Sequence, residues 1–320
     1  MSRYAIVFPG QGSQFVGMGA DLCAALPGAR ARYEQADDIL GFSLSGLCFE
    51  GPEETLGDTA NTQPAIYATT MILWEALAER LNGGSARIAL AAGHSLGEYA
   101  ALTAAGALDF EQGLCLVRER GLAMREAGEC APGGMAAIIG LSDEAVHEIM
   151  AQVQAEGLHA WVANYNSPGQ VVIAGCAQGL ERAVALAHER RAKRAIPLAV
   201  SVACHTPLMG AAAERLGAAL AETEIRTPWA PVVSNVTATP LSEPEEIRAA
   251  LLRQLSAPVR WVESVQAMST AGVTTMLEVG PKSVVAGLIR RIDGQINVAA
   301  ITDAASLEGV AETLAEAVPA

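Results

Sequence analysis

The sequence predicts an α/β protein in which a parallel sheet forms a larger core and a smaller βαββαβ unit is inserted into it. The first observation is the motif Gly93-His94-Ser95-Leu96-Gly97, which has an apolar run before it and helix-forming residues after it. The second is the pattern between residues 131 and 197, where strand, helix and strand follow one another twice, as in ferredoxin-like units. We therefore expect residues 1–130 and 198–320 to form the core and residues 131–197 to form the insert.

The composition is typical of a compact globular enzyme. Of the 320 residues, 51% are hydrophobic and 18% are charged, which is unlike a disordered or fibrous chain. The net charge of −14 argues against nucleic acid as a partner. The six cysteines include no C-x-x-C pair, an apolar strand-like run stands where a signal peptide would, and no apolar run is long enough to span a membrane. We expect a soluble, cytoplasmic protein with no membrane partner.

The chain begins with a predicted buried strand, Tyr4 to Phe8, and a tight loop follows at Pro9-Gly10-Gln11-Gly12. Ligands gather beyond the carboxyl ends of strands in doubly wound sheets, which would place Gln11 at a site. The alternative is a turn residue that faces water. Residues 21–81 are predicted to be helical with breaks at 27–28, 41 and 51–52, and a long apolar helix is expected to open at Thr62 and close at residues 82–84.

Ser95 is the candidate nucleophile because it lies in a G-x-S-x-G motif between a predicted strand and a predicted helix. In that context the two glycines let the strand and helix approach closely around a strained serine. The N-terminus of the helix then offers free N–H groups to a developing negative charge. The alternative is an ordinary strand-to-helix turn in which a serine is flanked by glycines.

Arg120 is the second candidate, because it lies on the inward side of a helix predicted from Asp109 to Glu126. At 3.6 residues per turn it falls on a line with Leu116 and Met124, opposite the charged face. A buried guanidinium costs several kcal/mol unless an anion meets it. The helix pattern alone leaves two possibilities open, a structural salt bridge or a fork for a substrate carboxylate.

The insert is predicted from six successive elements. Ser142 is expected to cap the first helix, which begins at Asp143, and a turn at residues 166–169 separates the two middle strands. The expected strands are 135–140, 161–164, 171–175 and a last one near Ala195, and the helices are 143–156 and 180–191.

His205 is the candidate catalytic base among five histidines. Leu198, Val200 and Val202 alternate with small residues and predict a strand, and Thr206-Pro207 predict a helix start, so His205 would stand at the joint between them. His94 adjoins the serine but should point away from its hydroxyl. The others, His147, His159 and His188, fall on polar stretches or a loop of the insert.

No acidic residue is well placed to orient this histidine. The nearest candidates between serine and histidine, Asp109 and Asp143, both lie where helix caps belong. We therefore expect a Ser-His pair whose orienting partner is a neutral oxygen. The remaining expected elements are strands at 232–236, 275–279 and 297–301 and helical pieces at 251–255 and 282–291.

With these pieces in place, nearly the whole chain resembles the malonyl-CoA:acyl carrier protein transacylase family. The segments that carry the resemblance are Phe8-Pro9-Gly10-Gln11-Gly12-Ser13-Gln14, Gly93-His94-Ser95-Leu96-Gly97-Glu98-Tyr99, Arg120-Gly121, Asn164-Tyr165-Asn166-Ser167-Pro168-Gly169-Gln170, His205, Arg253-Gln254-Leu255 and Glu278-Val279-Gly280-Pro281. The resemblance implies an α/β-hydrolase-like core with a ferredoxin-like insert, in agreement with the pattern above.

The resemblance also implies a ping-pong acyl transfer. Ser95, activated by His205, would attack malonyl-CoA, and the acyl carrier protein thiol would then take the malonyl group for fatty acid or polyketide synthesis. No cofactor or metal is implied. The resemblance implies that the main-chain N–H groups of Gln11 and Leu96 form the oxyanion hole. It implies that Arg120 binds the malonyl carboxylate and that Gln254 gives His205 its neutral hydrogen-bond acceptor.

Two further expectations concern partners. Acyl carrier protein is acidic, so docking would need a local basic patch, for which residues 190–194 and 290–291 are candidates; the alternative is a solvated charge run. We expect a monomer. Two rival functions stay open: a serine esterase or thioesterase that uses the same motif, and a non-catalytic scaffold that binds carrier protein.

Overall fold

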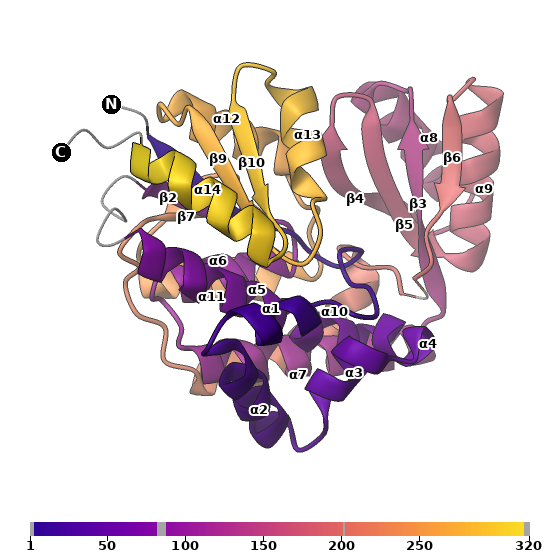
Figure 1. The fold of residues 1–320 in the computed structure, drawn as a ribbon. Helices are drawn as coiled ribbons and strands as arrows, with labels where there is room; N and C mark the ends of the chain where they lie inside the picture. The colour runs from indigo at the N-terminus through magenta and orange to yellow at the C-terminus, as the bar shows by residue number, and fades with distance from the viewer. Residues whose placement is uncertain (1–2, 82–87, 201, 317–320) are drawn as a thin grey trace.

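The larger sheet runs through the core of the protein, as the computed structural model shows for residues 3–81, 88–200 and 202–316 (Figure 1). Its strand order is β10-β9-β1-β2-β7-β8, and all neighbours pair in parallel except β8, which is antiparallel to β7. The strands are β1 (Tyr4–Phe8), β2 (Ile88–Gly93), β7 (Val232–Val233), β8 (Pro240–Leu241), β9 (Thr275–Val279) and β10 (Asn297–Ile301).

Helices cover both faces of this sheet (Figure 1). In the first part of the chain they are α1 (Ala20–Ala25), α2 (Ala29–Leu40), α3 (Leu44–Glu50), α4 (Glu53–Gly57), α5 (Thr59–Arg80), α6 (Gly97–Ala104) and α7 (Phe110–Cys130). In the last part they are the 3₁₀ turn η2 (Pro207–Met209), α10 (Gly210–Glu222), α11 (Pro244–Gln254), α12 (Trp261–Thr270), α13 (Val285–Ile292) and α14 (Ala304–Glu316). None of the helices in the described ranges is both long and apolar enough to cross a membrane.

The smaller sheet is antiparallel, with the order β4-β5-β3-β6, and α8 and α9 pack on it. Its elements are β3 (Gly133–Ile139), α8 (Asp143–Ala155), β4 (Ala160–Ser167), β5 (Gln170–Cys176), α9 (Ala177–Glu189) and β6 (Arg194–Pro197). This is the predicted βαββαβ order, and Ser142 caps α8 as expected. The predicted fold class is therefore confirmed, whereas the limits 1–130, 131–197 and 198–320 stay a prediction.

One predicted strand was wrong, and another is shorter than predicted. Residues 198–200 and 202 form no strand; the Leu198 N–H still donates to Met135 O, but the chain then leaves the sheet, and Leu198 and Val200 line a cavity instead. The strand that completes the larger sheet after the insert is the two-residue β7, shorter than the predicted 232–236. The predicted close of the long helix, at 82–84, lies outside the described residues.

The long central helix α5 begins three residues earlier than predicted, because Asp58 accepts a hydrogen bond from Ala60 N and caps it. Pro64 is therefore inside the helix, where it cannot donate to the carbonyl of Ala60. Arg118 of α7 replaces that donor, with its Nη1 2.6 Å from Ala60 O. This contact satisfies the carbonyl and joins α5 to α7.

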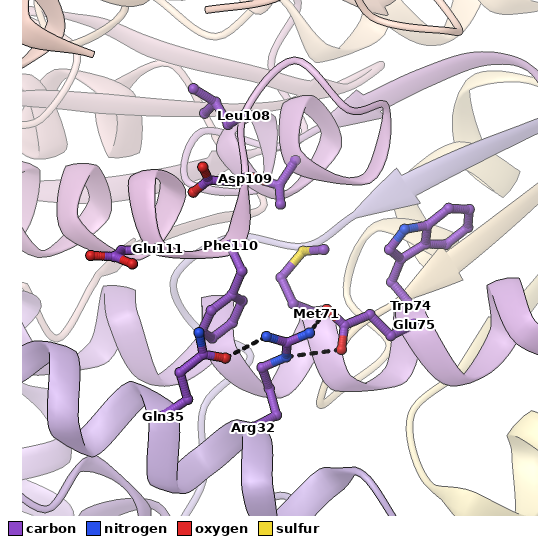
Figure 2. Close-up of a pocket in the computed structure, with 10 residues that line it drawn as sticks. Arg32, Gln35, Met71, Trp74, Glu75, Leu108, Asp109, Phe110 and Glu111 are labelled. Atoms are coloured by element: carbon purple, nitrogen blue, oxygen red, sulfur yellow. Dashed lines mark hydrogen bonds and ion pairs between the residues drawn. The ribbon is translucent and has the colours of Figure 1, made fainter. Parts of the chain in front are cut away.

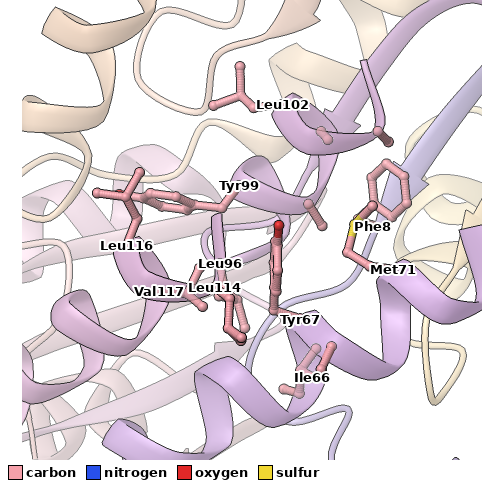
Figure 3. Packing of buried hydrophobic residues seen from close by; sticks show 14 of the residues in the cluster. Phe8, Ile66, Tyr67, Met71, Leu96, Tyr99, Leu102, Leu114, Leu116 and Val117 are labelled. Atoms are coloured by element: carbon pink, nitrogen blue, oxygen red, sulfur yellow. The ribbon is translucent and has the colours of Figure 1, made fainter. Parts of the chain in front are cut away.

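Apolar side chains from α5, α6 and α7 pack together behind the Ser95 motif (Figure 3). Leu96 and Tyr99 come from the start of the helix after Ser95, Tyr67 from α5 and Leu116 from α7, and each is at most 2% exposed. Fully burying one such side chain contributes about 1.5 to 3 kcal/mol. The packing therefore anchors the helix that follows the candidate nucleophile.

Candidate active site

Ser95 lies at a sharp turn between β2 and α6, with a φ of 52°. The glycines around it have no space for a side chain: a Cβ on Gly93 would lie 1.9 Å from Gly97 C and O, and one on Gly97 would lie 2.3 Å from Phe8 O. The motif therefore has the close strand-to-helix packing that the sequence predicted. The strain at Ser95 directs its hydroxyl to the end of the sheet.

His205 meets this hydroxyl. Its Nε2 lies 2.8 Å from Ser95 Oγ, and its Nδ1 lies 2.8 Å from the main-chain oxygen of Gln254. Because a carbonyl oxygen only accepts, Nδ1 must carry the proton and Nε2 is free to accept one. The arrangement is that of a nucleophile and its general base.

The histidine is buried and neutral. Burial, followed by the positive charge of Arg120, lowers the pKa of His205 to about 3. Its φ of 61° is unusual for a residue with a side chain. Thr206 caps η2 and Pro207 begins it, as predicted, although no strand precedes them.

Neither aspartate considered from the sequence contacts the histidine. Asp109 caps α7 in a capping box with Gln112, and Asp143 is the first residue of α8. The expected neutral partner is present, and it is the main-chain carbonyl of Gln254 rather than its side chain.

Arg120 is 1% exposed and reaches the same hydroxyl. Its Nη2 donates to Ser95 Oγ at 2.9 Å and to Gln254 Oε1 at 3.1 Å, and its Nη1 donates to Gln63 Oε1 at 2.6 Å. Among the described residues no carboxylate lies within 4.0 Å of it, and its Nε has no acceptor. All its partners are neutral oxygens, so the guanidinium keeps its capacity to bind an anion.

The loops after β1 and β2 bring Gln11 next to Ser95, because these strands are parallel neighbours that pair Phe8 with Gly93. Within the described part of the chain, the main-chain N–H groups of Gln11 and Leu96 have no acceptor. The Gln11 side chain accepts a hydrogen bond from Thr59 Oγ1 at 3.0 Å. The main-chain donors thus remain available at the cavity.

A cavity of about 540 Å³ is lined by Gln11, Ser95, Leu96, Arg120 and His205, whereas Gln254 does not line it. Loops that follow β1 and β2 of the larger sheet line one side of it, while Met135 and Val172 come from the smaller sheet, and Leu198 and Cys204 from the irregular segment beside it. Its size suits a small ligand, and an apolar wall with a few convergent polar groups is typical of such sites.

His94, beside Ser95 in the chain, turns away from the hydroxyl as predicted. Its Nε2 lies 2.8 Å from Asn166 Oδ1, which links the Ser95 turn to the end of β4. The other histidines lie elsewhere: His147 contacts Tyr165, and His159 stacks on Trp161.

Three buried polar residues of the site were missed from the sequence: Gln63, Glu98 and Asn235. Gln63 supports the guanidinium, while Glu98 and Asn235 lie behind the Ser95 turn. Each looks ordinary in the sequence, since glutamine and glutamate are common in helices. The one available signal was a polar side chain on an otherwise apolar stretch, as with Gln63 in α5.

The residues of the candidate basic patches differ in whether they already form ion pairs or hydrogen bonds within the protein. Arg190 pairs with Glu148 at 2.5 Å, Arg290 donates to Val298 O, and Arg291 donates to Gln170 Oε1. Lys193 and Arg194 are exposed, at or beside edge strand β6.

A second pocket, of about 430 Å³, lies between α2, α5 and the start of α7, away from Ser95 (Figure 2). Arg32 lines it: the guanidinium donates to both carboxylate oxygens of Glu75, at 3.0 and 2.7 Å, and lies over the Phe110 ring. The guanidinium of this pocket is already paired with a carboxylate, so the Ser95 cavity remains the candidate site.

Comparison with known proteins gives a consistent result. The acyl transferase domain family matches residues 5–308. The chain is 43% identical to a malonyl CoA-acyl carrier protein transacylase of Bacillus subtilis, over 99% of this chain and 98% of the relative. It is 46% identical to one of Haemophilus influenzae, over 98% of this chain and all of the relative.

Solved structures are equally similar. A malonyl-transacylase in complex with its type II PKS acyl-carrier protein superimposes with a TM-score of 0.93 at 45% identity, over 98% of this chain and 100% of that one. An acyl carrier protein S-malonyltransferase from Vibrio cholerae has a TM-score of 0.91 at 45% identity, over 97% and 100% of the two chains.

Proposed function

The chain belongs to the acyl transferase family, and we propose that it moves a malonyl group from malonyl-CoA to the phosphopantetheine thiol of acyl carrier protein. The product would supply fatty acid or polyketide synthesis. The observation that carries the proposal is Arg120, a buried guanidinium 2.9 Å from Ser95 Oγ whose hydrogen-bond acceptors are all neutral.

In the first half-reaction Ser95 Oγ attacks the thioester carbonyl while His205 Nε2 takes the hydroxyl proton. The N–H groups of Gln11 and Leu96 stabilise the oxyanion of the tetrahedral intermediate. When the intermediate collapses, the new Ser95–acyl ester remains and the C–S bond breaks. The CoA thiolate leaves with the proton from His205.

Arg120 distinguishes a malonyl group from a neutral acyl group. A carboxylate that entered the cavity could take two N–H donors from the guanidinium in a charge-assisted pair. Arginine suits this role because its planar fork matches a carboxylate. The residue would therefore hold the free end of the substrate while Ser95 reacts with the other end.

In the second half-reaction the thiol of the carrier protein attacks the malonyl ester, and His205 accepts the thiol proton. The bond between Ser95 Oγ and the malonyl carbonyl carbon then breaks, and His205 returns the proton to Ser95 Oγ. A buried dyad with a neutral orienting group and an apolar cavity wall favours transfer to a bound thiol over hydrolysis by water. Lys193 and Arg194 are the docking patch that we propose for the acidic carrier protein, since both are exposed at the start of β6, the strand that leads to Leu198 in the cavity wall.

We propose that the protein needs no cofactor besides its two substrates, because Ser95, His205 and the main-chain donors supply each chemical step. A cytoplasmic location and a monomeric state remain predictions. All six cysteines are free thiols, consistent with a reducing compartment.

Intact-protein mass spectrometry after brief mixing with malonyl-CoA tests the proposal. The wild-type protein should gain one malonyl group, and Ser95→Ala should gain none. Adding holo acyl carrier protein should then remove the group and yield malonyl carrier protein. A scaffold would gain no mass.

The esterase alternative is decided by the lifetime of the adduct. Without carrier protein, the malonyl-Ser95 adduct of a transferase should last much longer than one turnover takes when carrier protein is present. Rapid release of free malonate from malonyl-CoA alone would instead favour hydrolysis.

A further inference from the structure

Glu98 is a buried carboxylate that takes no part in the steps above. It lies three residues after Ser95 in α6 and is 3% exposed. Burial raises the pKa of Glu98 to about 7, against the opposing effects of its hydrogen-bond donors and of Arg120. A carboxylate in such a place costs free energy unless its surroundings use it.

Two donors from distant parts of the chain converge on one oxygen of this carboxylate. Gln254 Nε2 lies 2.6 Å from Glu98 Oε2, and the Asn235 main-chain N lies 3.3 Å from the same atom. Glu98 therefore joins α6 to the end of α11 and to the turn after β7.

Asn235 in turn holds the backbone around the nucleophile. Its Oδ1 accepts from Ser95 N at 2.6 Å, and its Nδ2 donates to Gly93 O at 2.6 Å. The Ser95 N–H is thereby occupied, which leaves the Leu96 N–H to face the cavity. Asn235 also braces the strained turn on both sides of Ser95.

Gln254 contacts the remaining members of the site. Its main-chain oxygen accepts from His205 Nδ1, its Nε2 also donates to Ser95 O at 3.0 Å, and its Oε1 accepts from Arg120. The amide thus has its NH₂ group toward the carboxylate and its oxygen toward the guanidinium. A flipped amide would set donors against donors at Arg120 and acceptor against acceptor at Glu98.

From these contacts we infer that Glu98 is a positioning residue for acyl transfer. It fixes the orientation of the Gln254 amide and the position of Asn235, and through them it aligns Ser95, His205 and Arg120. The inference rests on the proposed function, because alignment is measured as the rate at which Ser95 is malonylated.

The test is the rate of Ser95 malonylation, measured by quenched-flow mass spectrometry between pH 5.5 and 8.5. Glu98→Gln keeps the size of the side chain and removes its charge, so at pH 8 malonylation should slow between about 10- and 100-fold, as expected for small misalignments. The wild-type rate should fall below about pH 7, and the variant should show no such inflection. His205 does not change charge in this range, since its pKa is about 3.

Asn235→Ala is the second variant, in case Glu98→Gln folds poorly. It removes both hydrogen bonds to the Ser95 turn and leaves Glu98 in place, so it should be slow but keep the inflection. Glu111→Gln, on the exposed face of α7, is the matched control and should behave as wild type.

The outcomes separate the two proposals. Failure of the wild-type protein to acquire a malonyl group would contradict the proposed function. A wild-type rate and pH profile in Glu98→Gln would overturn the role of Glu98 while leaving the transfer itself intact. If that variant does not fold, rates that show no inflection near pH 7 in the wild-type protein and in Asn235→Ala would overturn it.

Discussion

Ser95 lies on regular structure between β2 and α6, whereas His205 lies in an irregular segment between β6 and η2. The turn at Ser95 depends on two glycines that are its near neighbours in the chain. The imidazole of His205 depends on the Gln254 carbonyl, 49 residues later, and on its own left-handed backbone.

Ser95 and His205 are therefore positioned by different kinds of contact. A strand-turn-helix unit places the nucleophile with local packing, and the helix behind it is anchored by Tyr99 and Leu96 in the core. The base is placed by a long-range contact, to the Gln254 carbonyl, together with its own left-handed backbone. Substitutions at the two kinds of position should therefore differ in which property they change and by how much.

The largest effect is expected from His205→Gln, which removes the base without disturbing the Ser95 turn. Loss of general-base catalysis should lower kcat/KM for malonyl-CoA by a factor of about 10² to 10⁴. Stopped-flow or quenched-flow malonylation measures it. His147→Gln, at an exposed position of α8, is the control, and equal rates in the two variants would mean that His205 is not the base.

Arg120→Ala should come next and should alter specificity as well as rate. Because the malonyl carboxylate would face no cation, kcat/KM for malonyl-CoA should fall by a factor equivalent to a few kcal/mol. The use of acetyl-CoA relative to malonyl-CoA should rise. The measurement is a parallel assay with both thioesters. Arg125→Ala, an exposed position on the same helix, should keep the malonyl preference, and an unchanged preference in Arg120→Ala would remove Arg120 from the site.

The features of the site that depend on neighbouring residues in the chain could be predicted from the sequence. The motif, its flanking strand and helix, the adjacent Gln11 loop and the inward direction of Arg120 all follow from short-range patterns. His205 was identified too, through its Thr206-Pro207 helix start, although the strand predicted before it was wrong. Leu198, Ala199 and Val200 all line the cavity, so the alternation of large and small residues there did not mark a strand.

The long-range hydrogen bonds that support the site could not be predicted from the sequence. That Gln254 contributes its main-chain oxygen to His205 and its side chain to Arg120 depends on how α11 packs against α6 and α7. Glu98 and Asn235 were missed for the same reason, since the hydrogen bond between Asn235 and Ser95 joins residues 140 positions apart. No periodicity encodes such a pairing.

A smaller effect is expected on stability as a function of pH. The pKa of His205 is about 3 in the folded protein and about 6.5 when unfolded, so below pH 6.5 the unfolded chain binds the extra proton first. The folded state therefore loses stability as pH falls from 6.5 toward 3. Urea unfolding at pH 7.5 and 4.5 should show a wild-type loss that exceeds that of His205→Gln by at most about 2 to 3 kcal/mol. Parallel losses would mean that the imidazole protonates freely.

The smallest effect should come from the docking patch, because exposed charges steer association and are screened by salt. Reversing Lys193 and Arg194 to glutamate should raise the KM for carrier protein by about tenfold or less at low salt. The rate of Ser95 malonylation by malonyl-CoA should stay unchanged, because neither residue lines the cavity.

Arg30→Glu, an exposed reversal on α2, is the matched control for that experiment. If it raises the KM for carrier protein as much as the paired reversal does, the effect comes from net charge and not from a patch. If instead the loss is confined to Lys193 and Arg194 and vanishes at high salt, the carrier protein docks beside β6. The carrier thiol would then enter the cavity past the irregular segment that bears His205, which would give that segment a part in delivering the second substrate as well as the base.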